Sequence, residues 1–198
     1  MREDHTQSTA LVVIDVLNRY EHPDAEPLRR SMRDAVPAIS SLVSEAAELG
    51  ARVVYVNDNY GDWSAGRDEL CRRALAGTDP ALVEPLLPPA DAAFVTKARH
   101  SVFYETPLEY LLRSNGVERV VLTGQVTEQC ILYSALDGYV RHFSIVVPAD
   151  AVAHIHRDLA DAAVRMMRVN MRAEIASAAT ALRSSGKRAA HAELARSG

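Results

Sequence analysis

The stretch RVVLTGQVTEQCILYSALDGYV, residues 119–140, joins an apolar, β-branched run to an amphipathic segment. The run at 119–124 is typical of a buried strand, because it is almost continuously apolar rather than alternating. From about Thr127 to Val140 the apolar residues recur at helical spacing, which predicts a helix with Thr127 as its cap. Cys130 then lies in the first helical turn, where the positive end of the helix favours a thiolate.

Four further runs resemble this strand, at residues 10–16, 52–58, 92–97 and 143–150. Helical patterns separate several of them, and strand–helix alternation predicts a parallel sheet with helices on both faces. We therefore expect an α/β fold: a three-layer α/β/α sandwich with a mostly parallel, doubly wound sheet of about six strands. The first and fourth strands should be central, and residues 171–177 should add a sixth strand at the edge.

One helical pattern contains a proline. Leu28 to Leu49 place apolar residues on one face, and Gly50 is suited to end the helix. Pro37 lies inside this pattern and is expected to kink or split the helix, because proline removes one backbone N–H.

Composition limits the class of protein. The 198 residues are 48% hydrophobic and 24% charged, with a net charge of −4, which predicts one globular domain over residues 1–198 with mobile ends at about 1–8 and 184–198. No basic cluster favours nucleic acid, and no apolar stretch is long enough for a membrane span. The charged start, MREDHTQST, does not resemble a signal peptide, so we expect a cytoplasmic protein in which Cys71 and Cys130 are free thiols.

Chemically capable residues cluster at the ends of the expected strands. Open parallel sheets bind ligands at the carboxyl ends of their strands, where Asp15, Lys97 and Cys130 all fall. Taken singly, the aspartate could solvate a strand end, the lysine could lie on the surface, and the cysteine could be a small core residue. Together they favour chemistry, because a neighbouring ammonium lowers the pKa of a thiol and a carboxylate can accept its proton.

These residues and their surroundings resemble a known family. Asp15 in ALVVIDVLNRY, Lys97 in TKARHSVF and Cys130 in LTGQVTEQC are similar to the catalytic triad of the isochorismatase-like cysteine hydrolases. That superfamily includes nicotinamidases, N-carbamoylsarcosine amidases, ureidoacrylate amidohydrolases and isochorismatase itself. The resemblance extends from about residue 9 to about residue 176.

The resemblance implies a mechanism and an assembly. Cys130 would attack a carbonyl, Asp15 would accept its proton, and Lys97 would stabilise the charges. A non-proline cis peptide bond between Val126 and Thr127 would turn backbone N–H groups toward the oxyanion. Homo-oligomers are usual in the family, so the resemblance also implies a dimer or larger assembly. It further implies a small-molecule substrate and no cofactor.

The sequence departs from the family in two places. The usual Asp-x-Gln start is Asp15-Val16-Leu17 here, so a glutamine that often contacts the site is missing. Nicotinamidases bind a metal through Asp-x-His, and the matching segment Asp58-Asn59-Tyr60 has no histidine. The pair His154 and His156 is expected to lie in a loop or at a helix start, so no metal is expected.

Four loop residues are candidates for the substrate pocket, each of which could equally serve packing: Asn18, Tyr20, Trp63 and Tyr104.

The leading interpretation is a metal-independent cysteine hydrolase that cleaves a C–N bond of a small amide, ureido or carbamoyl substrate. One alternative is an isochorismatase-type vinyl-ether hydrolase that depends on the aspartate. A second, of another class, is a non-catalytic binding or thiol redox-sensing module. A dinucleotide-binding domain is set aside, because DVLNRY rather than a glycine-rich motif follows the first strand.

Overall fold

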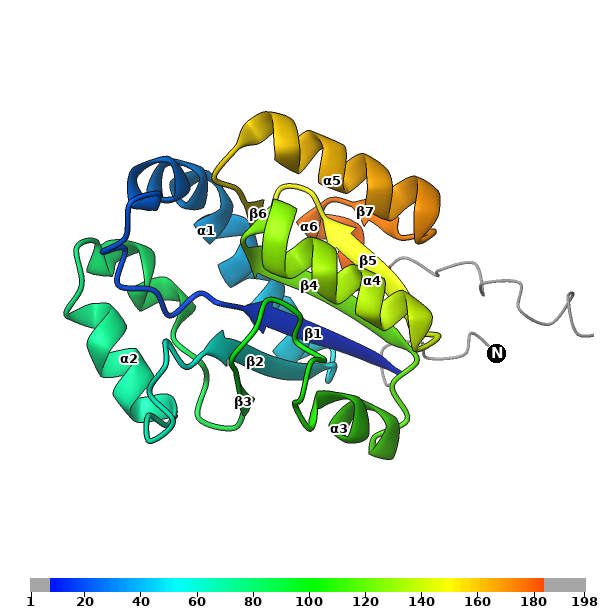
Figure 1. Ribbon diagram of the computed structural model, residues 1–198. Helices are drawn as coiled ribbons and strands as arrows, with labels where there is room; N and C mark the ends of the chain where they lie inside the picture. The colour runs from blue at the N-terminus through cyan, green and yellow to red at the C-terminus, as the bar shows by residue number, and fades with distance from the viewer. Residues whose placement is uncertain (1–7, 184–198) are drawn as a thin grey trace, which may run out of the picture.

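A parallel sheet of seven strands forms the centre of the molecule (Figure 1). The computed structural model describes residues 8–183, so the expectation about mobile ends lies almost wholly outside the described residues. The strands are β1 (Thr9–Ile14), β2 (Arg52–Asp58), β3 (Ala93–Lys97), β4 (Arg119–Gln125), β5 (Ser144–Pro148), β6 (Val152–Ala153) and β7 (Glu174–Ala176). Their order is β3-β2-β1-β4-β5-β7, with β6 paired to β4. The central position of β1 and β4 and the edge position of β7 confirm the expected topology.

One strand was not expected. β6 has two residues and pairs in parallel with the carboxyl end of β4, where Val152 lies opposite Gly124 and Ala153 opposite Gln125. A two-residue strand is too short to show the apolar run by which the other strands are recognised.

Helices cover both faces of the sheet. They are α1 (Ala25–Glu48), α2 (Arg67–Leu75), α3 (Leu108–Ser114), α4 (Leu132–Val140), α5 (Arg157–Asn170) and α6 (Ala178–Ala181), with 3₁₀ turns η1 (Pro80–Leu82) and η2 (Glu84–Leu86) and a π-helical turn η3 (Thr127–Ile131). One apolar core contains residues of α1, α2 and α6, and a second contains residues of α3, α4 and α5. The three-layer α/β/α sandwich is therefore confirmed.

The central strand β1 shows why both layers are needed. All six of its residues are buried; Leu11 and Val13 belong to the first core, and Val12 and Ile14 to the second. Successive side chains of a strand point to opposite faces, so a strand that is apolar from Ala10 to Ile14 must be covered on both sides.

Pro37 neither splits nor ends α1, which runs as one helix of 24 residues. Its buried side chains, including Leu28, Met32, Ile39 and Leu42, pack on the sheet on both sides of the proline. This packing outweighs the one backbone hydrogen bond that proline cannot make. Within residues 8–183, no helix is both long enough and apolar enough to cross a membrane.

Candidate active site

Asp15 follows β1 directly and is fixed by backbone contacts. Its N–H donates to the Val56 carbonyl at 3.0 Å, and its Oδ1 accepts the Asp58 N–H at 2.8 Å. Its own carbonyl accepts a hydrogen bond from Gln125 Nε2 at 2.6 Å. The residue is 7% exposed and has a φ of 54°, in the left-handed region. A buried carboxylate held in this way needs a nearby positive charge.

Lys97, the last residue of β3, supplies that charge. Its Nζ lies 2.8 Å from Asp15 Oδ2 and 3.7 Å from Asp58 Oδ2, and its side chain is 1% exposed. The same ammonium donates to Cys130 Sγ at 3.7 Å. The structure therefore brings the acid, the amine and the thiol of the expected triad together at the carboxyl edge of the sheet.

Cys130 lies on η3, and the local backbone differs from the expectation in two ways. The cis peptide bond joins Gln125 to Val126, one residue earlier than the expected bond between Val126 and Thr127. Thr127 does not cap the helix; its hydroxyl donates to the Ala153 carbonyl at 2.9 Å. The carbonyl acceptor on β6 is available only because that short strand pairs with the end of β4.

The electrostatics of the site correct a further expectation. Burial and the Asp15 carboxylate raise the pKa of the Cys130 thiol by more than Lys97 lowers it. Burial likewise raises the pKa of Asp15, against the opposing charge of Lys97. Burial disfavours the charge on Lys97, yet Asp15, Cys130 and Asp58 together outweigh that effect and raise its pKa. The direction of the Cys130 shift favours the neutral thiol, which lies beside the pair that Asp15 and Lys97 form at 2.8 Å.

Tyr20 is buried and contacts a residue that holds Asp15. It is 2% exposed, and its hydroxyl donates to Gln125 Oε1 at 3.3 Å. Because Gln125 in turn donates to the Asp15 carbonyl, the tyrosine holds the aspartate through one intermediary. Sequence reasoning missed Gln125, which is 1% exposed; a glutamine at the end of an apolar strand was the available signal.

Two of the pocket candidates line a cavity beside Lys97. The cavity has a volume of about 500 Å³, and Trp63 and Tyr104 line it together with Asp58 and Arg99. Trp63 is 84% exposed, so this ring is open to contact with a ligand. Asn18 lies elsewhere, in a separate cavity of about 310 Å³, where its side chain accepts the Tyr20 N–H at 2.7 Å.

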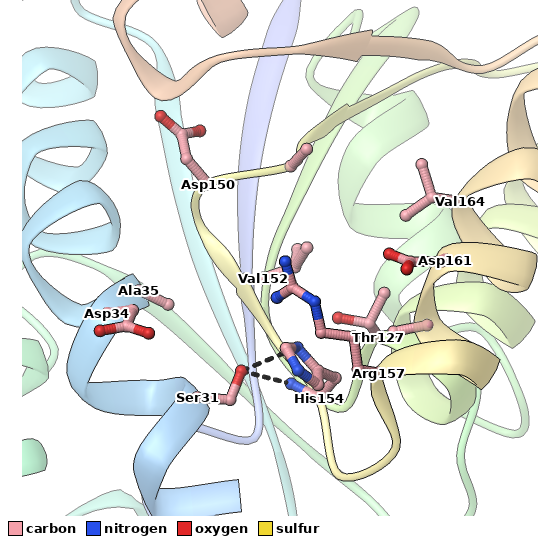
Figure 2. A pocket seen from close by; sticks show the side chains of 12 residues that line it. Ser31, Asp34, Ala35, Thr127, Asp150, Val152, His154, Arg157, Asp161 and Val164 are labelled. Carbon is pink, nitrogen blue, oxygen red and sulfur yellow. Dashed lines mark hydrogen bonds between the residues drawn. The ribbon is translucent and has the colours of Figure 1, made fainter.

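A third cavity, of about 450 Å³, lies between α1 and α5 (Figure 2). Thr127 is the residue of η3 that lines it. His154 Nδ1 pairs with Ser31 Oγ at 2.9 Å, and His156 is the residue that precedes α5. Among residues 8–183, no three His, Cys, Asp or Glu side chains are placed to hold a metal ion.

Sequence reasoning also missed His100. Its Nδ1 lies 3.7 Å from Cys130 Sγ, on the loop between β3 and α3. A histidine three residues after Lys97 gave no periodic signal, because the contact arises from the path of a loop.

Comparisons with known proteins show the family to which the chain is similar. The family model of the isochorismatase domain matches residues 9–180. An uncharacterized isochorismatase family protein of Bacillus subtilis is 31% identical over 166 residues, which cover 84% of this chain and 92% of the relative. A ureidoacrylate amidohydrolase of Methylorubrum extorquens is 32% identical over 171 residues, covering 73% of this chain and 69% of the relative.

A solved structure is similar over most of the chain. The crystal structure of N-carbamoylsarcosine amidase from Thermoplasma acidophilum matches with a TM-score of 0.67 and 29% identity, covering 86% of this chain and 96% of that one.

Proposed function

The chain belongs to the isochorismatase family of hydrolases, and from this premise we propose that it cleaves the C–N bond of a small amide, ureido or carbamoyl substrate through a Cys130 acyl-enzyme. The observation that supports the proposal most is the contact of Cys130 Sγ with Lys97 Nζ at 3.7 Å, with Asp15 only 2.8 Å from the same ammonium. The names of relatives, ureidoacrylate amidohydrolase and maleamate amidohydrolase, favour C–N chemistry.

In this mechanism the thiol loses its proton as it attacks. The sulfur forms a bond to the carbonyl carbon, the S–H proton passes to the Asp15 carboxylate, and the carbonyl electron pair moves to oxygen. When the C–N bond breaks, Asp15 returns the proton to the leaving nitrogen. Water then hydrolyses the thioester. Lys97 stabilises the negative charge of the site in every step, because its ammonium contacts both the acid and the sulfur.

The oxyanion is assigned to the backbone around Val126 and Thr127. The N–H groups of Gln129 and Ile131 are not available, because both donate to the Val126 carbonyl, at 3.0 Å and 3.1 Å. The Val126 N–H reaches the sulfur, where it lowers the pKa of the Cys130 thiol against the stronger effect of burial. A donor beside the attacking atom is well placed for the oxygen that becomes charged.

We place the substrate's distal part in the cavity beside Lys97. Trp63 and Tyr104 offer aromatic surface, and Asp58 and Arg99 offer one charge of each sign. A volume of about 500 Å³ suits a small molecule. No metal is needed in this scheme, and the two free cysteines fit a reducing compartment, the cytoplasm.

We also propose a homodimer formed through α5. Leu159, Met166 and Val169 form a stripe on its outer face and are 51%, 45% and 64% exposed. These residues lie at positions that share one face of a helix. An apolar stripe of this kind is a candidate for contact with another helix.

The charges along α5 favour a second copy as the partner. Asp158 in its first half and Arg165 in its second half lie seven residues apart beside the stripe, and both are exposed. In two antiparallel α5 helices related by a twofold axis, Asp158 of each helix faces Arg165 of the other. The α5 helix of a second copy of this chain therefore presents charges complementary to those beside the stripe.

The function is tested by measuring ammonia release from a panel of small amides and ureides, with isochorismate as a parallel substrate. Cys130→Ala should lower turnover of the best substrate at least about a thousandfold while the fold stays intact. Mass spectrometry with a slow substrate should find the acyl group on Cys130. Pyruvate release from isochorismate without ammonia from any amide, or wild-type turnover by Cys130→Ala, would instead support the vinyl-ether alternative.

A further inference from the structure

The Cys130 thiol has a second titratable neighbour besides the buried ion pair. His100 is exposed, and its Nδ1 lies 3.7 Å from Sγ. The ring packs against Tyr133 of α4, with centroids 5.5 Å apart and planes tilted by 34°. The sulfur therefore contacts a buried ammonium, Lys97, and an exposed imidazole.

His100 Nδ1 has fewer hydrogen-bond and ion-pair partners than the Asp15 carboxylate. Asp15 Oδ1 accepts the Asp58 N–H and Oδ2 pairs with Lys97. Within residues 8–183, His100 takes part in no ion pair, and the sulfur of Cys130 is the hydrogen-bond partner of its Nδ1.

The groups around His100 are few. Arg99 precedes it on the same loop, and Cys130 and Tyr133 face it from η3 and α4. Lys97 reaches the sulfur but has its own partners in Asp15 and Asp58. No carboxylate among the described residues is paired with the ring, so the thiol is the acidic group that it meets.

We propose that His100 is a second proton acceptor for the Cys130 thiol, a further catalytic residue of the hydrolase described above. The inference rests on that proposed function. In the tautomer with hydrogen on Nε2, the S–H bond breaks, the proton binds Nδ1, and the electron pair stays on sulfur, which gives a thiolate beside an imidazolium. When the C–N bond breaks, the imidazolium passes the same proton to the leaving nitrogen and becomes neutral again.

This second route has a physical reason. Burial and Asp15 raise the pKa of the Cys130 thiol, so a thiolate forms at neutral pH only when its proton moves to a close neighbour. His100 is exposed, so its ring can exchange protons with water, which the buried Asp15 and Lys97 cannot do as easily. An imidazole is also the side chain best suited to accept and release a proton near neutral pH.

The test measures the thiol directly, without a substrate. Wild type, His100→Gln and His100→Phe are treated with iodoacetamide between pH 6 and pH 9, and alkylation of Cys130 is followed by mass spectrometry. Both variants should react about tenfold more slowly at pH 7, and the difference should shrink as the pH rises and hydroxide deprotonates the thiol. His156→Gln, an exposed histidine on another element, is the matched control and should react like wild type.

Turnover gives the second readout. His100→Gln should lower kcat/KM by about 10- to 100-fold, less than the loss of a sole general base, because Asp15 remains. The pH dependence of kcat/KM should differ from that of wild type while KM changes little. Alkylation profiles of wild type and both variants that superimpose would overturn the proposal. A fully active Cys130→Ala enzyme would overturn the hydrolase mechanism instead, and the alkylation result would still decide whether His100 takes the thiol's proton.

Discussion

Replacing Lys97 with methionine should destabilise the protein in a manner that depends on pH. Methionine keeps the apolar stem of the side chain and removes the ammonium 2.8 Å from Asp15, which is 7% exposed. The Asp15 carboxylate, now without its partner, either stays charged in the interior or takes up a proton. The free energy of protonating it is therefore the upper limit of the loss in free energy of unfolding. Protonating an aspartate of ordinary pKa, 3.8, costs about 1.4 kcal/mol for each pH unit above that pKa. The upper limit of the stability loss is therefore about 4 kcal/mol at pH 7.

The sign of the effect follows from linkage. Without Lys97 the pKa of folded Asp15 rises further above its unfolded value, so the folded state binds the proton more tightly. Stability is then highest at low pH and falls as the pH rises toward the folded pKa. The loss should shrink from up to about 4 kcal/mol at pH 7 to less than about 2 kcal/mol at pH 5. At pH 7 this corresponds to a fall in Tm of about 8–16 °C for a protein of this size.

Urea unfolding at pH 5, 6 and 7 measures these free energies of unfolding. The double variant Asp15→Asn/Lys97→Met is the control, because it leaves no buried charge at this position, and its stability relative to wild type should vary much less over this range. A loss in Lys97→Met that is equal at pH 5 and pH 7 would refute the reasoning, since it would mean that the ammonium does not hold a carboxylate ionised.

Two further predictions concern metal and assembly. Turnover should survive exhaustive dialysis against a chelator, because the Asp58 segment lacks the histidine of a metal site and a catalytic zinc has about three protein ligands; loss on chelation with recovery on adding zinc would contradict this. Light scattering should give about 43 kDa, twice the chain mass of 21.6 kDa, and Val169→Asp should shift it to the monomer mass, whereas Leu75→Asp on the exposed surface of α2 should not. A wild-type protein found only at 21.6 kDa would exclude the α5 dimer.

Most of the fold could be predicted because strands buried on both faces have a distinctive sequence. β1 is apolar from Ala10 to Ile14, β4 contains the apolar run Val120–Leu122, and all residues of both strands are buried. β6 could not be predicted, since two residues carry no periodicity and its pairing is set by the end of β4. The continuity of α1 through Pro37 could not be predicted from the local preference of proline against helix interiors, because it depends on the packing of α1 against the sheet.

The site was only partly predictable, for a related reason. Strand ends place Asp15, Lys97 and Cys130 at one edge, and that placement follows from topology alone. The upward shift of the Cys130 pKa could not be predicted from the sequence. The position of Cys130 at a helix terminus indicates the nearby charge but not the burial, and burial is the larger effect here. The contacts of His100 and Gln125 depend on the path of a loop and on one side-chain rotamer, and neither is encoded by spacing.

The distance between acid and thiol depends on how closely the two central strands approach. Gly124 on β4 lies opposite Ile14 on β1, and its φ of +110° is one that residues with side chains rarely adopt. A Cβ at this position would lie 2.2 Å from the Ile14 carbonyl oxygen, so any other residue would force the strands apart. Asp15 follows Ile14 directly, and the turn that carries Cys130 begins three residues after Gly124. A contact that only glycine allows therefore sets the separation across which the proposed proton transfer from Cys130 to Asp15 takes place.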